Sequence, residues 1–290
     1  MKIGVVLPQT EIGNDPAAIK AYALAVEEMG FTHILVFDHV LGANPDRPGG
    51  WKGPYTYRHG FHEPFVLFGF LAAATRRVEL VTGIIILPQR QTALVAKQAA
   101  AVDVLSGGRL RLGVAVGWNP VEFEALGEDF TTRGRRIEEQ IEVMRALWTR
   151  ELVTFVGKHH RITDAGLNPL PVQRPIPVWM GGESPVVQRR MARVADGWMP
   201  HFRPGAPAQA IVDRLHGMIR EAGRDPKAFG IEGRMTLSQI EPAEWGRELE
   251  AWRQMRGISH LCVHTTGLQL AKPADHIETL RRFRKTAGLT

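Results

Sequence analysis

The chain has 290 residues, of which 44% are hydrophobic and 23% charged, as is ordinary for a soluble globular enzyme. A chain of this length can bury a sizeable core, and its single cysteine, Cys262, excludes an internal disulfide. A formal net charge of +6 is typical of nucleic-acid-binding proteins, but here the arginines are spread along segments of helical spacing. We interpret them as solvated helix faces and expect no nucleic-acid partner.

Short β-branched runs alternate with longer segments of helical spacing. The runs that predict strands cover residues 2–7, 33–37, 79–87, 109–116, 178–180, 197–200, 230–236 and 260–264. The segments that predict helices cover residues 15–29, 64–75, 93–105, 133–148, 185–195, 208–222, 245–255 and 273–287. This α/β alternation predicts a (β/α)₈ TIM barrel formed by one domain over residues 1–290.

Two segments interrupt the alternation. Residues 42–62 are polar and rich in glycine and proline, which predicts an ordered loop. Residues 152–177 follow the fourth strand and combine two β-branched runs with several prolines, which predicts a hairpin insertion. The structural alternative is a doubly wound open sheet. It would need a glycine-rich dinucleotide turn, and residues 7–13 after the first strand lack one.

No apolar run approaches the ~18 residues that a membrane span needs. The apolar run at the N-terminus stops at Pro8 and is too short for a signal peptide. We therefore expect a cytoplasmic protein without a membrane partner.

The unusual residues collect directly after strands, where enzymes of this fold carry their chemistry. They are Gln9, Asp38 with His39, Gly117-Trp118-Asn119, Gly181-Gly182-Glu183-Ser184, and His201.

Asp38 and His39 form a candidate acid/base pair, because a neighbouring carboxylate can orient a histidine or raise its pKa. The alternative is a solvated loop. Gly83 lies inside a buried strand, which indicates either close approach of a ligand or packing against a large neighbour.

Ser184 and Pro185 predict a capped helix start behind two glycines. The free N–H groups of such a start suit a phosphate, although a plain capped helix explains the same pattern. Near a phosphate, the Glu183 side chain should point away. Asn119 similarly predicts either a cap for the helix carrying Glu122 or a polar cofactor contact.

Histidine pairs occur at His59 and His62 and at His159 and His160. Neither pair follows a strand together with a carboxylate, so we predict no metal site.

Several blocks resemble the luciferase-like monooxygenase superfamily, and most closely its deazaflavin (coenzyme F420) dependent branch. They occur in order at residues 37–40, 82–90, 96–109, 112–119, 122–127, 179–184 and 195–198. One departure is Ala115, where the family usually has glycine.

The resemblance implies a bacterial luciferase-like barrel with an insertion after strand four, coenzyme F420 or FMN as hydride carrier, and a homodimer. Asp38 and His39 would lie near the reactive ring. A non-prolyl cis peptide between Gly83 and Ile84 would support that ring from behind. The remaining cofactor contacts would come from Gly117, Trp118, Asn119, Gly181, Gly182, Glu183 and Ser184.

The sequence thus predicts an oxidoreductase that passes a hydride between its cofactor and a small organic substrate. His39 would be the general acid or base with Asp38 as its partner, and Gln9, Trp51 and His201 would contact the substrate. The alternatives are an FMN-dependent monooxygenase that uses O₂ and a non-catalytic flavin-binding barrel.

Overall fold

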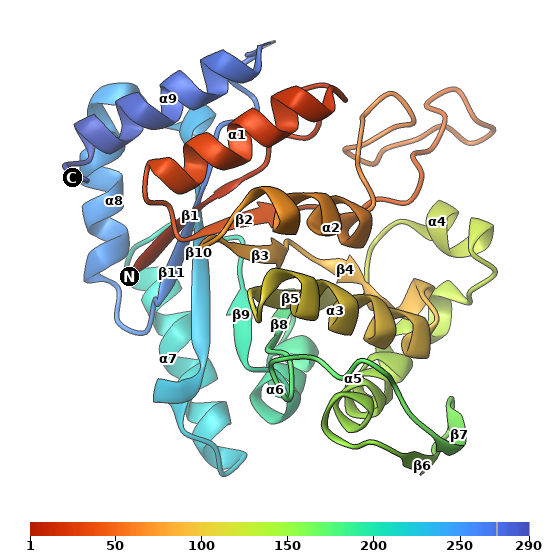
Figure 1. Ribbon diagram of the computed structural model, residues 1–290. Coiled ribbons are helices and arrows are strands. Elements are labelled where there is room, and N and C mark those ends of the chain that lie inside the picture. Colours follow the sequence, from red (N-terminus) through yellow and green to blue (C-terminus); the bar gives the residue numbers. More distant parts are fainter. Residues whose placement is uncertain (271, 290) are drawn as a thin grey trace. The chain divides into compact units, whose positions relative to one another are not determined.

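The computed structural model describes residues 1–270 and 272–289 (Figure 1). The chain contains two compact units. Unit 1 comprises Met1–Val36, Ala74–Val81 and Trp179–Thr290, and unit 2 comprises Phe37–Ala73 and Thr82–Val178.

Unit 1 holds a parallel sheet with the strand order β3-β2-β1-β11-β10-β9-β8. Its strands are β1 Lys2–Val6, β2 His33–Val36, β3 Glu79–Thr82, β8 Val178–Gly181, β9 Gly197–Met199, β10 Gly230–Thr236 and β11 His260–His264. Its helices are α1 Pro16–Glu28, α6 Pro185–Val194, α7 Ala206–Glu221, α8 Trp245–Gln254 and α9 Pro273–Thr286. Figure 1 shows α9 beside α1 and α8, and these helix pairs are in contact.

Tryptophans pack against glycine backbone in the core of unit 1. Trp179 lies over Gly197 and Gly230, and Trp252 lies over Gly233, so that a Cβ atom at any of these glycines would overlap an indole ring. The glycines therefore let large buried rings pack directly on the sheet.

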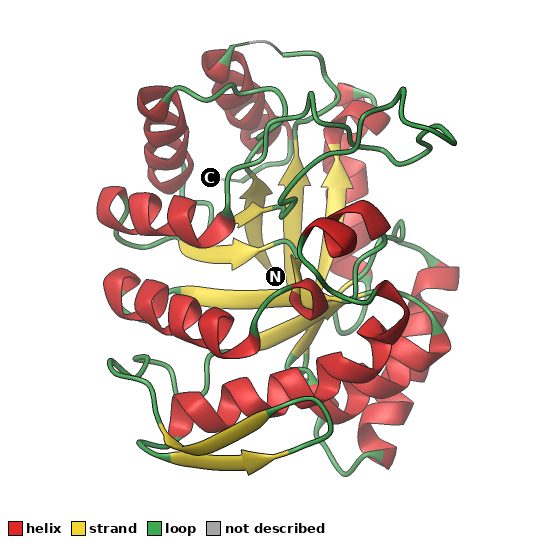
Figure 2. Cartoon of the chain, turned by 90° about the vertical axis from the view of Figure 1, so that its right-hand side faces the viewer, coloured by secondary structure: helices red, strands yellow, loops and turns green. Residues whose placement is uncertain are grey.

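Unit 2 contains the remaining parallel strands and their helices. Its elements are β4 Ile85–Ile86, β5 Leu110–Ala115, α2 Pro64–Ala74, α3 Thr92–Ser106, α4 Pro120–Ala125 and α5 Arg133–Thr149. The predicted insertion forms an antiparallel hairpin of β6 Val153–Val156 and β7 Arg161–Ala165, which Figure 2 shows as a separate two-stranded sheet. The hairpin prediction is confirmed.

Helix starts follow the capping residues of the sequence. Asp15 caps α1 by accepting a hydrogen bond from the N–H of Ala17 at 3.0 Å. Ser184 caps α6 and Asn119 caps α4, each followed by proline at the first helical position. The cap predicted at Asn119 is therefore present.

The predicted third strand is interrupted. One strand was expected over residues 79–87, but β3 ends at Thr82, β4 covers Ile85 and Ile86, and a 3₁₀ turn follows over Leu87–Gln89. Ile84 has φ of 147°, a conformation that turns its backbone out of the extended strand. With β3 and β4 counted as one interrupted strand, the predicted order of eight parallel strands with helices between them is confirmed within the described residues.

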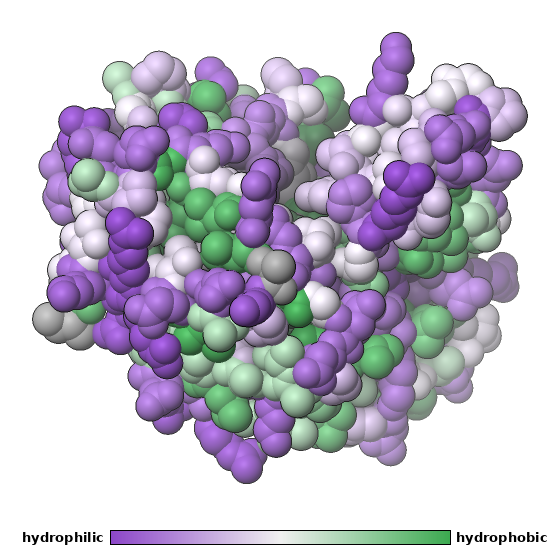
Figure 3. Space-filling view, turned by 90° about the horizontal axis from the view of Figure 1, so that it is seen from above, coloured by the Kyte–Doolittle hydropathy of each residue, from purple (hydrophilic) through white to green (hydrophobic). Residues whose placement is uncertain are grey.

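The surface seen in Figure 3 is covered largely by hydrophilic side chains, and its apolar side chains gather in several separate patches. Among the described residues, no helix has both the length and the apolar character to cross a bilayer.

Candidate functional site

His39 is held by a carboxylate, but not by the one that the sequence suggested. Its Nδ1 lies 3.3 Å from Oε1 of Glu122, in the first turn of α4. Glu122 Oε1 also accepts hydrogen bonds from the backbone N–H groups of Val40 at 2.7 Å and Leu41 at 3.4 Å. One buried carboxylate thus fixes both the imidazole and the loop after β2.

Asp38 has a different partner. Its Oδ1 accepts a hydrogen bond from Nη2 of Arg90 at 2.7 Å, and its Oδ2 accepts one from the N–H of Ile86 at 3.3 Å. Burial raises the pKa of Asp38, and the Arg90 guanidinium opposes that rise. The predicted pairing of Asp38 with His39 is therefore wrong, because each side chain faces a partner distant in sequence.

The carboxylate of Glu122 also determines the tautomer of His39. A carboxylate accepts hydrogen bonds, so the Nδ1 of a neutral His39 carries the proton and its Nε2 keeps a lone pair. When Nε2 takes up a proton, the resulting imidazolium lies next to a negative charge. This arrangement suits a group that accepts and returns a proton at Nε2.

Aromatic rings surround this imidazole. The ring centroids of Tyr55 and Phe61 each lie 4.9 Å from that of His39, and the centroid of Trp118 lies 5.7 Å away. His39, the loop residues and Asn119 line a cavity of about 260 Å³. Trp51 lies against Trp118 with a centroid distance of 5.8 Å, so this predicted substrate contact belongs to the same aromatic group.

Backbone strain marks the segment bound to Asp38. Ile84 has a positive φ, which is costly for a β-branched residue and is typical of positions held for function. The predicted cis peptide at Gly83–Ile84 is wrong: the cis bonds among the described residues are Asn168–Pro169 and Arg174–Pro175.

Gln89 is a functional candidate that the sequence reasoning missed. Its side chain is 3% exposed, and neither amide atom has a hydrogen-bond partner within the described residues. A buried amide without partners costs free energy, so it is a candidate contact for a bound ligand. The position just after the interrupted strand was the available signal.

The Gly117-Trp118-Asn119 turn follows β5. Gly117 has φ of 73°, and a Cβ atom there would overlap the Ile86 side chain, so only glycine fits. Trp118 is 42% exposed. Asn119 Oδ1 accepts a hydrogen bond from the N–H of Val121 at 3.1 Å, so this oxygen serves the cap of α4.

The remaining predicted residues lie in unit 1. Gly182, with φ of 114°, and Ser184 lead into α6. Glu183 Oε1 accepts a hydrogen bond from the N–H of His201 at 2.8 Å, so this carboxylate points toward the segment that follows β9.

Gln9, which follows β1, is buried. Burial and the nearby Arg234 lower the pKa of His201.

His33, Glu232 and Cys262 form a buried cluster of potential metal ligands in unit 1. His33 Nε2 and Glu232 Oε1 are 2.6 Å apart, and the Thr32 hydroxyl is 2.9 Å from Nδ1 of His33. Both ring nitrogens are thus engaged, and we interpret the cluster as a satisfied polar pair in the core.

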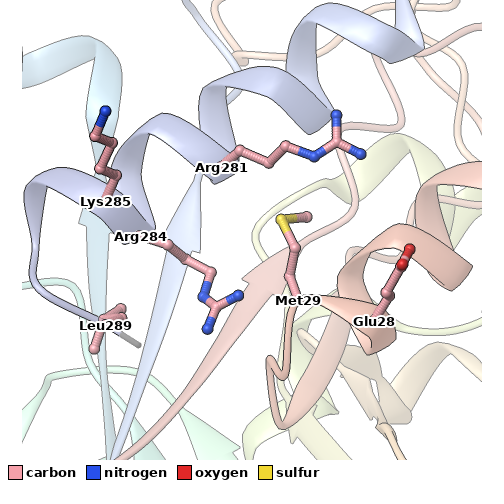
Figure 4. Close-up of a pocket in the computed structure, with 6 residues that line it drawn as sticks. All are labelled: Glu28, Met29, Arg281, Arg284, Lys285 and Leu289. Atoms are coloured by element: carbon pink, nitrogen blue, oxygen red, sulfur yellow. The ribbon is translucent and has the colours of Figure 1, made fainter.

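A cavity of about 530 Å³ lies where the end of α1 faces α9. Figure 4 shows its lining residues, with Lys285 directed away from Glu28 and Met29. Arg281 is paired with Glu278 on its own helix. These cations belong to the basic helix face that the sequence predicted to be solvated.

The sequence matches one protein family over nearly its whole length. The family model for luciferase-like monooxygenase matches residues 1–285. An uncharacterised protein of Mycobacterium tuberculosis is 36% identical over 210 residues, which cover 70% of this chain and 71% of that protein.

Two relatives carry functional names. An FMNH(2)-dependent dimethylsulfone monooxygenase of Pseudomonas putida is 33% identical over 193 residues, 62% of this chain and 53% of the relative. An F420-dependent glucose-6-phosphate dehydrogenase of Amycolatopsis mediterranei is 30% identical over 228 residues, 76% of this chain and 63% of the relative.

A solved structure, the monooxygenase RslO1 of Streptomyces bottropensis, matches with a TM-score of 0.75 at 20% identity and covers 99% of this chain and 98% of its own. This likeness supports the predicted barrel fold. With the family model spanning nearly every residue, the chain belongs to the luciferase-like monooxygenase family of oxidoreductases.

Proposed function

We propose that the chain is a flavin- or deazaflavin-dependent oxidoreductase that transfers a hydride between its cofactor and a small organic substrate. The observation that carries this proposal is His39, fixed by the buried carboxylate of Glu122 at the wall of an aromatic cavity. Relatives named for FMNH(2) and for F420 support either as the cofactor.

The described residues of unit 2 fit a large planar cofactor. The strained backbone at Ile84 and the orphaned amide of Gln89 are features that a bound ring system would explain. Gly117, which has no room for a side chain, lets backbone approach closely. The other proposed cofactor contacts in unit 2 are Gly83, Ile84, Trp118 and Asn119. In unit 1, the proposed contacts to a cofactor phosphate are residues Gly181–Ser184.

When bound, the cofactor supplies the hydride chemistry, and the protein supplies orientation and proton handling. His39 holds or releases a proton at Nε2, and Glu122 stabilises the charged imidazole. The ion pair of Asp38 with Arg90 holds the segment after β4 to the loop after β2. The rings of Tyr55, Phe61 and Trp118 pack around the imidazole and limit its orientation.

The experiment that tests the proposal is an absorbance titration of the purified protein with FMN and with coenzyme F420, followed by redox turnover with candidate substrates. Saturable perturbation of one spectrum and substrate-dependent bleaching or recovery are expected. Enzyme-dependent transfer of an oxygen atom from O₂ to the substrate, with reduced FMN present, would identify the monooxygenase alternative. A cofactor that binds but never turns over would support the non-catalytic barrel, and binding of neither cofactor would overturn the proposal.

We also propose that the protein is a cytoplasmic homodimer, with α2 in the interface. This helix consists of apolar residues and glycine, yet Val66 is 74% and Phe70 is 40% exposed. The two residues are four positions apart and so share one helix face, which indicates a surface that a partner covers. Sedimentation should give a dimer that Val66→Lys dissociates; a monomeric wild type at micromolar concentration would contradict it.

A further inference from the structure

A third cavity, of about 420 Å³, lies in unit 1 at the carboxyl ends of three neighbouring strands. Its lining comes from the segment after β9, the end of β10 with the turn that follows, α8 and the last residue of β11. These residues are His201, Phe202, Arg203, Arg234, Met235, Thr236, Gln239, Ile240, Glu248 and His264. The volume is in the range of small-molecule sites.

Two guanidinium groups, those of Arg203 and Arg234, line this cavity together with one carboxylate, Glu248. A second carboxylate, Glu183, lies beside the lining and accepts a hydrogen bond from the N–H of His201. Arg203 Nη2 donates a hydrogen bond to Oε1 of Gln239 at 3.4 Å, which positions the guanidinium at the cavity.

The two histidines act as neutral groups at pH 7. Burial, with smaller effects of Arg234 and His276, lowers the pKa of His264 to about 4. Burial and Arg234 likewise lower the pKa of His201, against the opposing effect of Glu183. Neutral imidazoles supply hydrogen-bond donors and acceptors without adding charge.

The rest of the lining is apolar. Phe202 packs with its ring stacked at 5.9 Å from that of Trp252, and Met235 and Ile240 complete the apolar side. Arginine matches planar or tetrahedral oxyanions with two parallel N–H groups. An apolar wall beside arginines suits a small organic acid.

We propose that this cavity binds the oxyanion end, a carboxylate, sulfonate or phosphate, of the substrate. This assignment of substrate class rests on the proposed oxidoreductase function, because substrates bind at the carboxyl ends of strands in this fold. A phosphate of the cofactor has the same chemistry, and the experiment separates the two sources.

The test is calorimetric titration of the cofactor-free full chain with methanesulfonate, acetate and inorganic phosphate at low ionic strength. Saturable binding of at least one anion is expected. Arg203→Gln should weaken it by about tenfold, the effect of one charge-assisted hydrogen bond. Glu248→Gln should strengthen it, because the variant removes the only carboxylate of the described lining.

Arg247→Gln is the matched control. Arg247 lies on α8 beside Glu248, is paired with Glu244 and does not line the cavity, so its replacement should leave anion affinity unchanged. No anion binding by the wild type, or equal losses in Arg203→Gln and Arg247→Gln, would overturn the proposal.

Cofactor titration of Arg203→Gln distinguishes the two sources. An unchanged cofactor Kd supports a substrate site, whereas a weakened one assigns the cavity to the cofactor's phosphate and overturns the substrate assignment. Because the anion titration needs no cofactor, its result does not depend on the absorbance titration that tests the oxidoreductase function.

Discussion

The two units arrange their charges in opposite ways around their candidate sites. In unit 2, Glu122 is satisfied by His39 and two backbone N–H groups, and Asp38 by Arg90 and one N–H. The cavity of about 420 Å³ in unit 1 instead holds two arginines and two histidines, and burial lowers the pKa of both histidines. We propose that the first arrangement serves proton transfer and that the second serves anion binding.

Replacement of His39, the proposed proton-transfer group, should have the largest effect on turnover. His39→Ala should lower turnover by about 10²–10⁴-fold while the cofactor stays bound, because it removes the general acid or base. Steady-state kinetics with an absorbance titration checks both parts. Turnover equal to that of the wild type would show that His39 has no chemical role.

Glu122→Gln should have the next largest effect. It keeps the size of the side chain but removes the charge beside His39, and a charge-assisted hydrogen bond of about 1.5–3 kcal/mol corresponds to roughly 10–100-fold in turnover. Asp38→Asn is the comparison variant, and an equal loss of turnover in both variants would remove the special role of Glu122.

The lowered pKa of His264 predicts that the folded protein loses stability in acid. The folded pKa of His264, about 4, lies below the ordinary value of 6.5, so the unfolded chain binds more protons between these two values. The free energy of unfolding should therefore decrease as pH falls from about 6.5 to 4, by up to about 1.4 kcal/mol per pH unit for this residue.

Urea unfolding of wild type and His264→Gln across this pH range isolates that contribution. The difference between the two proteins should shrink toward acid pH, since the variant lacks the group that resists protonation. A difference independent of pH would show that His264 titrates normally.

The smallest effect concerns Gln89. Gln89→Met replaces an amide that has no partner within the described residues, so the ligand-free protein should keep or gain stability. Cofactor affinity should decrease by about 2–13-fold, the value of one hydrogen bond of about 0.5–1.5 kcal/mol. Thermal unfolding and the absorbance titration measure the two quantities, and lost stability with unchanged affinity would make Gln89 a structural residue.

Much of the fold could be predicted because capping residues and apolar runs that lie close together in the sequence determine it. The predicted caps Asn119 and Ser184 stand directly before their helices, and β10 and β11 match the predicted ranges. The interruption at Ile84 could not be predicted from propensity, because isoleucine in an apolar run favours a continuous strand.

The candidate site was predicted only in part. The turns after strands could be located, and His39 does line a cavity. Its partner Glu122 is 83 positions away, and proximity in sequence favoured Asp38 instead. Pairing of buried charges depends on tertiary contacts that one sequence does not reveal.

The interruption between β3 and β4 has a consequence for amide hydrogen exchange. It divides one strand into ladders of four and two residues, and short ladders open more readily than long ones. The amides at Gly83 and Ile84 should therefore exchange with deuterated solvent faster than those of Leu80 and Val81. A planar ligand resting against this backbone would slow that exchange, which makes the strained residue a reporter of occupancy that requires no chromophore.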